Sequence, residues 1–315
     1  MTPPETEPAV RKAQRGACTR RESARQALVV PVMLAGSTLW GLYWLPLRWL
    51  EQAGLGGLWA LAFIYLGAVG TLGALARRHW RRAVASRWRL LGIATSAALS
   101  GIAFGLGMIE GAVARVLILF YLSPMWAVLL ARLLLGERVR PVTLPALVLG
   151  LFGAGLMLWP DAPASTPAAA PLALLAFGRA DLLGLVAGLA FALTNLQLRA
   201  GRDLPGALKN LATCALVPPL AGAAAFVLDA PLAAPLWAVP AALGVGLSWL
   251  SAMTAATQFG ISRLPLQRSS VLLLFELVVG ATSAALLAGE ALGLAELTGG
   301  ACIVLAGLAV VWLRV

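Results

Sequence analysis

The sequence predicts an all-α membrane protein with ten transmembrane helices arranged in two inverted five-helix repeats. Three observations support this prediction: the apolar composition, an internal repeat, and an uneven distribution of arginine. Of the 315 residues, 60% are hydrophobic and only 12% are charged, and the mean hydropathy is +0.88. A soluble core cannot bury so much apolar side chain, whereas lipid can surround it. Composition alone therefore indicates a chain that crosses the membrane many times.

The strongest internal pattern is a repeat of two apolar runs joined by a short turn. Residues 115–159 hold the first copy, and the same pattern recurs 153 positions later. The aligned pairs include Arg115 with Arg268, Gly136-Glu137 with Gly289-Glu290, and Trp159 with Trp312. Self-similarity at one fixed spacing indicates an internal duplication.

The duplicated chain divides into membrane-length helices. A hydrocarbon core about 30 Å thick requires about 20 helical residues. The predicted spans are residues 28–48, 57–76, 90–110, 114–135, 142–159, 182–199, 209–228, 236–259, 268–288 and 294–313. The first five spans form the first repeat, over 28–159, and the last five form the second, over 182–315. A Pro/Ala-rich linker over 160–181 separates the two repeats.

Residues 1–27 precede the first span and carry six basic residues among Pro, Glu, Thr and Gln. This composition is too polar to bury, so we expect a disordered, basic cytoplasmic tail. A basic arm can also bind nucleic acid. Arginines beside a membrane span are explained more simply as topology determinants that face anionic lipid. We therefore expect membrane lipids, and no nucleic acid, among the partners.

Arginine and lysine gather on one side of the predicted topology. Twenty of the 24 basic residues fall in the tail, in the loops that follow even-numbered spans, and at the chain end. Arg132 lies within one turn of the same side, which leaves Arg48, Arg115 and Arg179 for the opposite side. Because basic residues favour the cytoplasmic side, we expect both termini in the cytoplasm and the protein in a bacterial inner (plasma) membrane.

The two copies of the repeated turn carry opposite charge. Residues 136–141 contain two arginines and face inside, whereas 289–296 contain two glutamates and no basic residue and face outside. Five spans per repeat force this inversion of topology. Inverted repeats are typical of secondary transporters, in which two bundles rock about a site near the midplane. The alternative is a scaffold that duplication has enlarged.

Two motifs add a resemblance to this pattern. The fourth predicted span opens on Tyr121-Leu122-Ser123-Pro124, and the ninth carries Phe275-Glu276 ahead of Gly289-Glu290. Together with the ten spans, these motifs resemble the EamA-type transporters of the drug/metabolite transporter superfamily, over about residues 30–313. This chain has Leu277 where that family often carries proline after the glutamate. The resemblance implies a ten-helix basket with a central cavity lined by spans 1, 3, 4, 6, 8 and 9, which moves small metabolites, often outward.

Glu276 is the sharpest site candidate because it lies about 12 Å along the ninth span from Arg268, at 1.5 Å per residue. A carboxylate at that depth costs roughly 3 kcal/mol on insertion scales unless it is protonated, paired or hydrated. Ser269 and Ser283 recur at seven-residue intervals with Glu276, which indicates that this face looks into a cavity. The carboxyl group can carry a proton or bind a substrate amine. Alternatively, it holds two helices together.

Two tryptophans of the first span, Trp40 and Trp44, share one helix face, where indoles can stack on a flat or cationic substrate. The alternative is helix packing or, for Trp44, anchoring at the membrane interface. The sixth span is the repeat mate of the first, and an offset of 151 aligns its Asn195 with Trp44. We predict that all three residues bind substrate, with an interhelical hydrogen bond as the alternative for the amide.

Tyr121 and Ser123 flank the start of the fourth-span motif, and the 153-residue offset sets Ser123 opposite Glu276. Pro124 removes a backbone donor, and such interruptions are common where a helix lines a cavity. Trp249 lies among serines in the eighth span, which makes that span polar enough for a cavity wall. We predict Tyr121, Ser123 and Trp249 as further substrate-binding residues, with ordinary packing as the alternative.

No motif indicates a cofactor, a metal or enzymatic chemistry. The sequence has no Walker loop, no dinucleotide fingerprint and no His/Cys/carboxylate set with metal spacing, and its three cysteines are scattered. We therefore expect a secondary active transporter that exports small polar or amphipathic metabolites, such as amino acids, by alternating access, with or without proton coupling. The alternatives are a membrane-embedded enzyme and a scaffold or flippase subunit that act on lipid-linked intermediates.

Overall fold

A computed structural model describes residues 27–110, 116, 119–136, 143–157, 178–228, 232, 234–288 and 293–312. Over these residues the chain is helical, with short 3-10 and π segments and no strand. All but the last residue of the predicted tail at 1–27 and most of the predicted linker at 160–181 lie outside the described residues, as do the turns at Glu137 and Glu290. The all-α class predicted from the sequence is confirmed over the part that the structure describes.

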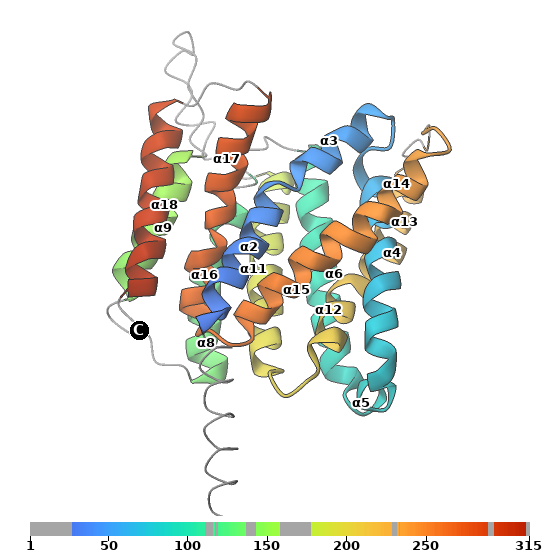
Figure 1. Cartoon of the computed structure of the whole chain (residues 1–315), viewed down its shortest axis with the longest axis horizontal. Coiled ribbons are helices and arrows are strands. Elements are labelled where there is room, and N and C mark those ends of the chain that lie inside the picture. The colour runs from blue at the N-terminus through green and yellow to red at the C-terminus, as the bar shows by residue number, and fades with distance from the viewer. Residues whose placement is uncertain are drawn as a thin grey trace, which may run out of the picture.

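The helices follow one another in two halves (Figure 1). The first half contains α2 (Val29–Gly41), α3 (Trp44–Gln52), α4 (Gly57–Ala76), η1 (Arg77–His79), α5 (Trp80–Ala85), α6 (Arg87–Glu110), α8 (Ser123–Leu135) and α9 (Thr143–Met157). The second half contains α11 (Arg179–Ala200), α12 (Gly206–Ala215), α13 (Val217–Val227), α14 (Ala238–Val245), η2 (Gly246–Leu250), α15 (Ser251–Ile261), α16 (Leu266–Leu273), α17 (Phe275–Ala288) and α18 (Leu294–Trp312).

Seven helical stretches of the described chain are long and apolar enough to cross a membrane. They are Val29–Gln52, Gly57–Ala85, Arg87–Gly107, Arg179–Ala200, Gly206–Val227, Ala238–Ile261 and Arg268–Leu287. Three shorter apolar helices, Ser123–Leu135, Leu144–Leu156 and Leu297–Ala306, lie where the sequence predicts the fourth, fifth and tenth spans. The chain is therefore a multi-pass membrane protein, and seven of its ten predicted spans have a counterpart of membrane-crossing length.

Helix α11 begins before the predicted sixth span. The predicted linker runs to residue 181, but the helix starts at Arg179. Asp181 explains the earlier start, because its Oδ2 accepts a hydrogen bond from the backbone N–H of Gly178 at 2.7 Å. A carboxylate in the first turn also faces the positive end of the helix dipole. The charged residues that resemble a loop in the sequence thus begin the helix.

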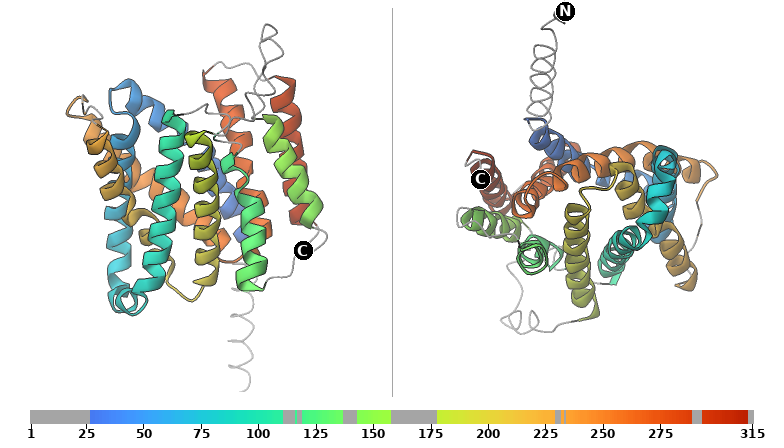
Figure 2. Two further views of the ribbon diagram at one scale, coloured as in Figure 1. Left: turned by 180° about the vertical axis from the view of Figure 1, so that it is seen from behind. Right: turned by 90° about the horizontal axis from the view of Figure 1, so that it is seen from below.

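The helices pack in pairs that join the two halves (Figures 1 and 2). Helix α6 packs along α11, and α2 packs along α15; α8 also contacts α11, and α16 and α17 also contact α2. Helix α4 contacts α12, α13, α14 and η2. Helices α9 and α18 form a pair of their own at one side of the bundle. Most contacts therefore connect helices that are far apart in the sequence.

Two of these close approaches require glycine. A Cβ on Gly41 of α2 would lie 2.6 Å from the carbonyl oxygen of Glu276, and a Cβ on Gly188 of α11 would lie 2.7 Å from the carbonyl oxygen of Phe120. Small residues of this kind let membrane helices come together backbone to backbone. The first span is thereby held against the ninth, and the sixth against the fourth.

Candidate functional site

Two of the predicted spans, the fourth and the ninth, are interrupted at positions that the 153-residue offset aligns. In the fourth span, Tyr121 and Leu122 form a turn and α8 begins at Ser123. In the ninth span, α16 ends at Leu273 and α17 begins at Phe275, with Leu274 between them. Pro124 accounts for the first interruption, because proline is favoured in the first turn of a helix. The second interruption occurs without a proline.

The interruptions meet at a hydrogen bond between the two spans. The phenol Oη of Tyr121 donates to Oε1 of Glu276 at 2.9 Å. Both side chains are only partly buried, whereas the neighbouring Ser123, Asn195 and Ser270 are buried. The fourth, sixth and ninth spans thus bring a carboxyl group, a phenol, an amide and two hydroxyls into one region of the bundle.

These groups surround a small cavity. It is lined by Phe120, Tyr121, Ser123, Pro124, Phe191, Asn195, Ser270, Leu273, Leu274 and Glu276. Its volume of about 10 Å³ is close to the space that a single water molecule needs. Four of the seven predicted site residues line this cavity together: Tyr121, Ser123, Asn195 and Glu276.

An aromatic group forms the apolar wall of the cavity. The ring of Phe120 lies 4.8 Å from that of Phe104, 5.3 Å from that of Tyr121 and 5.3 Å from that of Phe191. These are ordinary tilted and edge-on aromatic contacts. No sequence pattern distinguishes Phe120 or Ser270, because apolar residues and serines are common along every span. Only their place beside Glu276 distinguishes them.

The three predicted tryptophans lie outside this cavity. The indole N–H of Trp44 donates to Oγ of Ser283 at 2.9 Å, and that of Trp249 donates to the carbonyl oxygen of Leu39 at 3.0 Å. The ring of Trp40 lies 5.9 Å from that of Tyr43 in an edge-on contact. These contacts tie the first span to the eighth and ninth spans. A role of the tryptophans in substrate binding stays a prediction.

The serine stripe of the ninth span does not look into the cavity as a whole. Ser283 accepts the hydrogen bond from Trp44 and so faces the first span. Ser269 is buried and donates to the carbonyl oxygen of Leu266 in its own helix. Neither serine lines the cavity beside Glu276, and a cavity along the whole stripe stays a prediction. Leu274 interrupts the helix between Ser269 and Glu276, and a seven-residue pattern drawn for one continuous helix does not include this interruption.

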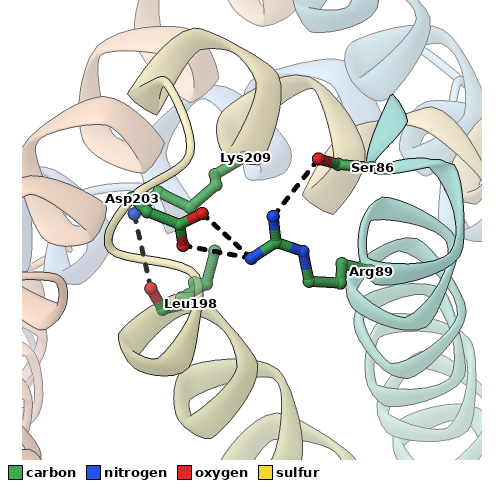
Figure 3. Close-up of polar contacts among 5 residues, drawn as sticks. All are labelled: Ser86, Arg89, Leu198, Asp203 and Lys209. Carbon is green, nitrogen blue, oxygen red and sulfur yellow. Dashed lines mark hydrogen bonds and ion pairs between the residues drawn. The ribbon is translucent and has the colours of Figure 1, made fainter. Parts of the chain in front are cut away.

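A second set of polar contacts connects the helix ends on the arginine-rich side (Figure 3). Nη1 of Arg89, at the start of α6, lies 3.1 and 3.0 Å from the two carboxylate oxygens of Asp203, in the turn between α11 and α12. Nη2 of Arg89 also donates to Oγ of Ser86 at 3.3 Å. The hydrogen bond from Arg89 holds the pKa of Asp203 below its ordinary value.

Lys209 is part of the same region and corrects a boundary. The seventh span is predicted to begin at Lys209, with the ammonium group in the loop, but α12 begins at Gly206. The side chain is only 2% exposed. Its Nζ donates to the carbonyl oxygen of Leu198 at 3.3 Å and to Oγ of Ser262 at 2.8 Å (Figure 3 draws the contact with Leu198). These acceptors let the helix include a lysine that hydropathy alone assigns to a loop.

Comparison with known proteins gives a relative that is named a transporter and a solved structure of similar fold. No protein-family model matches the chain. A protein of Archaeoglobus fulgidus named an uncharacterized transporter is 29% identical over 229 residues, which make up 71% of this chain and 76% of that protein. A solved crystal structure matches with a TM-score of 0.70 at 20% identity, covering 90% of this chain and 98% of that one. At that identity the match shows that the two chains share a fold.

Proposed function

We propose that this chain is a secondary active transporter that carries a small polar or amphipathic metabolite across the membrane by alternating access. The main support is the cavity at which a carboxyl group, a phenol, an amide and hydroxyls meet beside two interrupted spans. Interrupted helices at the interface between repeats are a typical setting for transporter binding sites. The A. fulgidus relative, which is named a transporter, supports the same class of function.

Helix pairing supports two inverted five-helix repeats within this proposal. Helix α2 belongs to the first span and α15 to the eighth, whereas α6 belongs to the third and α11 to the sixth. If the first span corresponds to the sixth and the third to the eighth, the contact of α2 with α15 is equivalent to the contact of α11 with α6. The contacts of α2 with α16 and α17, and of α11 with α8, correspond in the same way. The three shorter apolar helices then complete ten spans, the arrangement expected of EamA-type transporters.

The size of the cavity supports a mechanism in which helices move. A volume of about 10 Å³ compares with roughly 300–1,000 Å³ for pockets that enclose small-molecule ligands. A metabolite therefore requires the lining helices to separate. The hydrogen bond between Tyr121 and Glu276 joins two of these helices, so opening the site has to break it or carry both helices together.

The lining groups favour a substrate with a polar or cationic group and an apolar body. The oxygens of Glu276 can accept hydrogen bonds from an ammonium group, and Asn195 and Ser270 can hold further polar atoms. Phe120 and Phe191 offer aromatic faces to the apolar part. Amino acids and related amphipathic compounds fit this description. In our proposal the arginine-rich side faces the cytoplasm, and the transport direction is export.

Glu276→Gln tests the proposed role of the carboxyl group in proton coupling. Glutamine keeps the size of the side chain but cannot release a proton. In proteoliposomes screened with amino acids and related amines, the variant should lose accumulation driven by a pH gradient and keep substrate exchange without a gradient. Glu51→Gln, which changes an exposed carboxylate on α3, should leave both activities intact.

The outcomes separate the alternatives. Gradient-driven accumulation that persists in Glu276→Gln contradicts proton coupling through this residue. Loss of both activities in a well-folded variant assigns the carboxylate to substrate binding instead. Poor expression and folding would identify Glu276 as a contact that holds the helices together. A wild-type protein that moves none of the screened compounds in either direction contradicts the transporter proposal.

A further inference from the structure

The segment between α4 and α6 forms a cationic surface that the proposed transport mechanism does not use. Residues 77–89, here called the 77–89 segment, comprise η1, α5 and the start of α6 and read RRHWRRAVASRWR. They contain six arginines, one histidine and two tryptophans, and no acidic residue. The segment therefore presents positive charge and indole together within 13 positions.

Exposure shows that this surface is free to contact something outside the protein. All six arginines are exposed, and Trp80 and Trp88 are 70% and 72% exposed. Arg89 is paired with Asp203, and the guanidinium of Arg87 lies 5.6 Å from the ring centre of Trp88. The structure gives no carboxylate partner, among the residues it describes, to the remaining four: Arg77, Arg78, Arg81 and Arg82.

The position of the segment fixes the kind of environment it meets. Helix α4 ends at Ala76 and α6 begins at Arg87, and both belong to stretches long enough to cross a membrane. The connection between them therefore lies at the level of the lipid headgroups. Figures 1 and 2 show α5 at the end of the bundle, beyond the ends of its neighbours.

We propose that the 77–89 segment is a docking surface for the headgroups of anionic phospholipids. Exposed guanidinium groups complement lipid phosphates, with which arginine forms paired hydrogen bonds. Indole rings favour the membrane–water interface, where the apolar ring and the polar N–H are both accommodated. A nucleic acid can also pair with arginine and stack its bases on indole, and an acidic protein can pair with arginine. Lipid headgroups are favoured because the segment joins two membrane-crossing stretches and therefore already lies beside them.

The contribution of each charge sets the size of the expected effect. A basic residue near an anionic membrane surface strengthens binding about fivefold. Removing two arginines from the segment should therefore weaken the binding of anionic lipid about 25-fold. The preference should also fall as salt is added, because exposed charges are screened over about 10 Å at 0.1 M.

The test titrates the purified full chain, in a neutral detergent, with dioctanoyl phosphatidylglycerol or dioctanoyl phosphatidylcholine and follows binding by native mass spectrometry. Wild type should prefer phosphatidylglycerol, and Arg81→Gln/Arg82→Gln should lose most of that preference while binding phosphatidylcholine as before. Arg132→Gln/Arg202→Gln removes the same charge from exposed positions on the same side and should keep most of the preference.

A second pair of variants separates indole anchoring from charge. Trp80→Ala/Trp88→Ala should weaken the binding of both lipids, because the interface attracts indole whatever the headgroup charge. Melting of each variant without added lipid shows whether it is folded. If the double arginine variant does not fold, Arg82→Gln alone should still weaken phosphatidylglycerol binding about fivefold.

Several results would overturn the proposal. One is a wild-type protein with equal affinity for the two lipids. Another is an equal loss of preference in Arg132→Gln/Arg202→Gln, which would make net charge, and not the segment, responsible. A third is displacement of phosphatidylglycerol by a short single-stranded RNA at equal phosphate concentration, which would favour nucleic acid as the partner.

Discussion

Replacing Gly41 by alanine tests the close contact that holds the first span against the ninth span at Glu276. The added Cβ would lie 2.6 Å from the carbonyl oxygen of Glu276 and 2.7 Å from Cβ of Val279. Carbon atoms in contact are normally about 3.5–4.0 Å apart, so the two helices have to separate. Overpacking of this kind costs about 1–3 kcal/mol. Alanine recovers at most about 1 kcal/mol through its higher helix propensity, so the upper end of that cost leaves a net loss of about 2–3 kcal/mol.

The assay compares melting midpoints in detergent and substrate exchange in proteoliposomes. Gly41→Ala should melt a few degrees below wild type and exchange substrate more slowly, because the backbone that carries Glu276 is displaced. The matched control is Gly101→Ala in α6, where a Cβ would meet no atom within 4 Å. This control should melt at or above the wild-type midpoint. A Gly41→Ala variant that melts and exchanges like wild type would refute the close-contact argument.

Three further predictions concern the arginine-rich side and its opposite. If the Arg89–Asp203 ion pair helps to keep the arginine-rich side closed, Arg89→Asp or Asp203→Arg alone should increase the labelling, from that side, of a cysteine placed at Ser270. The double reversal should restore the wild-type rate. Equal labelling in all three variants would contradict this role of the ion pair. Because Arg89 lowers the pKa of Asp203, this contribution is present above the ordinary carboxyl pKa and is lost as the pH falls through the lowered value. The labelling rate of wild type, divided by that of Asp203→Asn at the same pH to cancel the titration of the thiol itself, should therefore rise toward one in acid. A cysteine at Leu236, which is 96% exposed at the opposite side, should react with an impermeant thiol reagent from outside the cell, and one at Ala83 should not. The reverse pattern would contradict the proposal that the arginine-rich side faces the cytoplasm.

Composition and internal repetition predict the class of this fold, because the lipid environment and the length needed to cross it constrain the residues of every span. Lipid demands long apolar helices, so seven spans of membrane-crossing length stand where the sequence predicts them. The 153-residue offset likewise pairs Ser123 with Glu276, and both residues line the same cavity. It cannot indicate that Tyr121 reaches Glu276, because that distance depends on how two spans rotate and pack against each other.

The features that the sequence predicts incorrectly share one cause. In each case a residue that is distant in the sequence supplies the hydrogen-bond partner of a polar group, which the sequence alone does not show. Lys209 resembles a loop residue until the acceptors on Leu198 and Ser262 are in place. Trp44 resembles a free indole until Ser283 accepts its N–H. Periodicity identifies the face on which a side chain lies, and only packing identifies its partner.

The chemistry of the cavity is asymmetric between the halves, and this limits what each transport cycle can carry. Among the described residues that line the cavity, Glu276 is the only carboxylate, and its repeat mate is the neutral Ser123. The first half contributes Phe120 and Tyr121, whereas the acid and Asn195 come from the second half, so neither half forms the site alone. A single carboxyl group can release one proton or balance one positive charge at a time. If Glu276 is the coupling group, it carries at most one proton in each cycle.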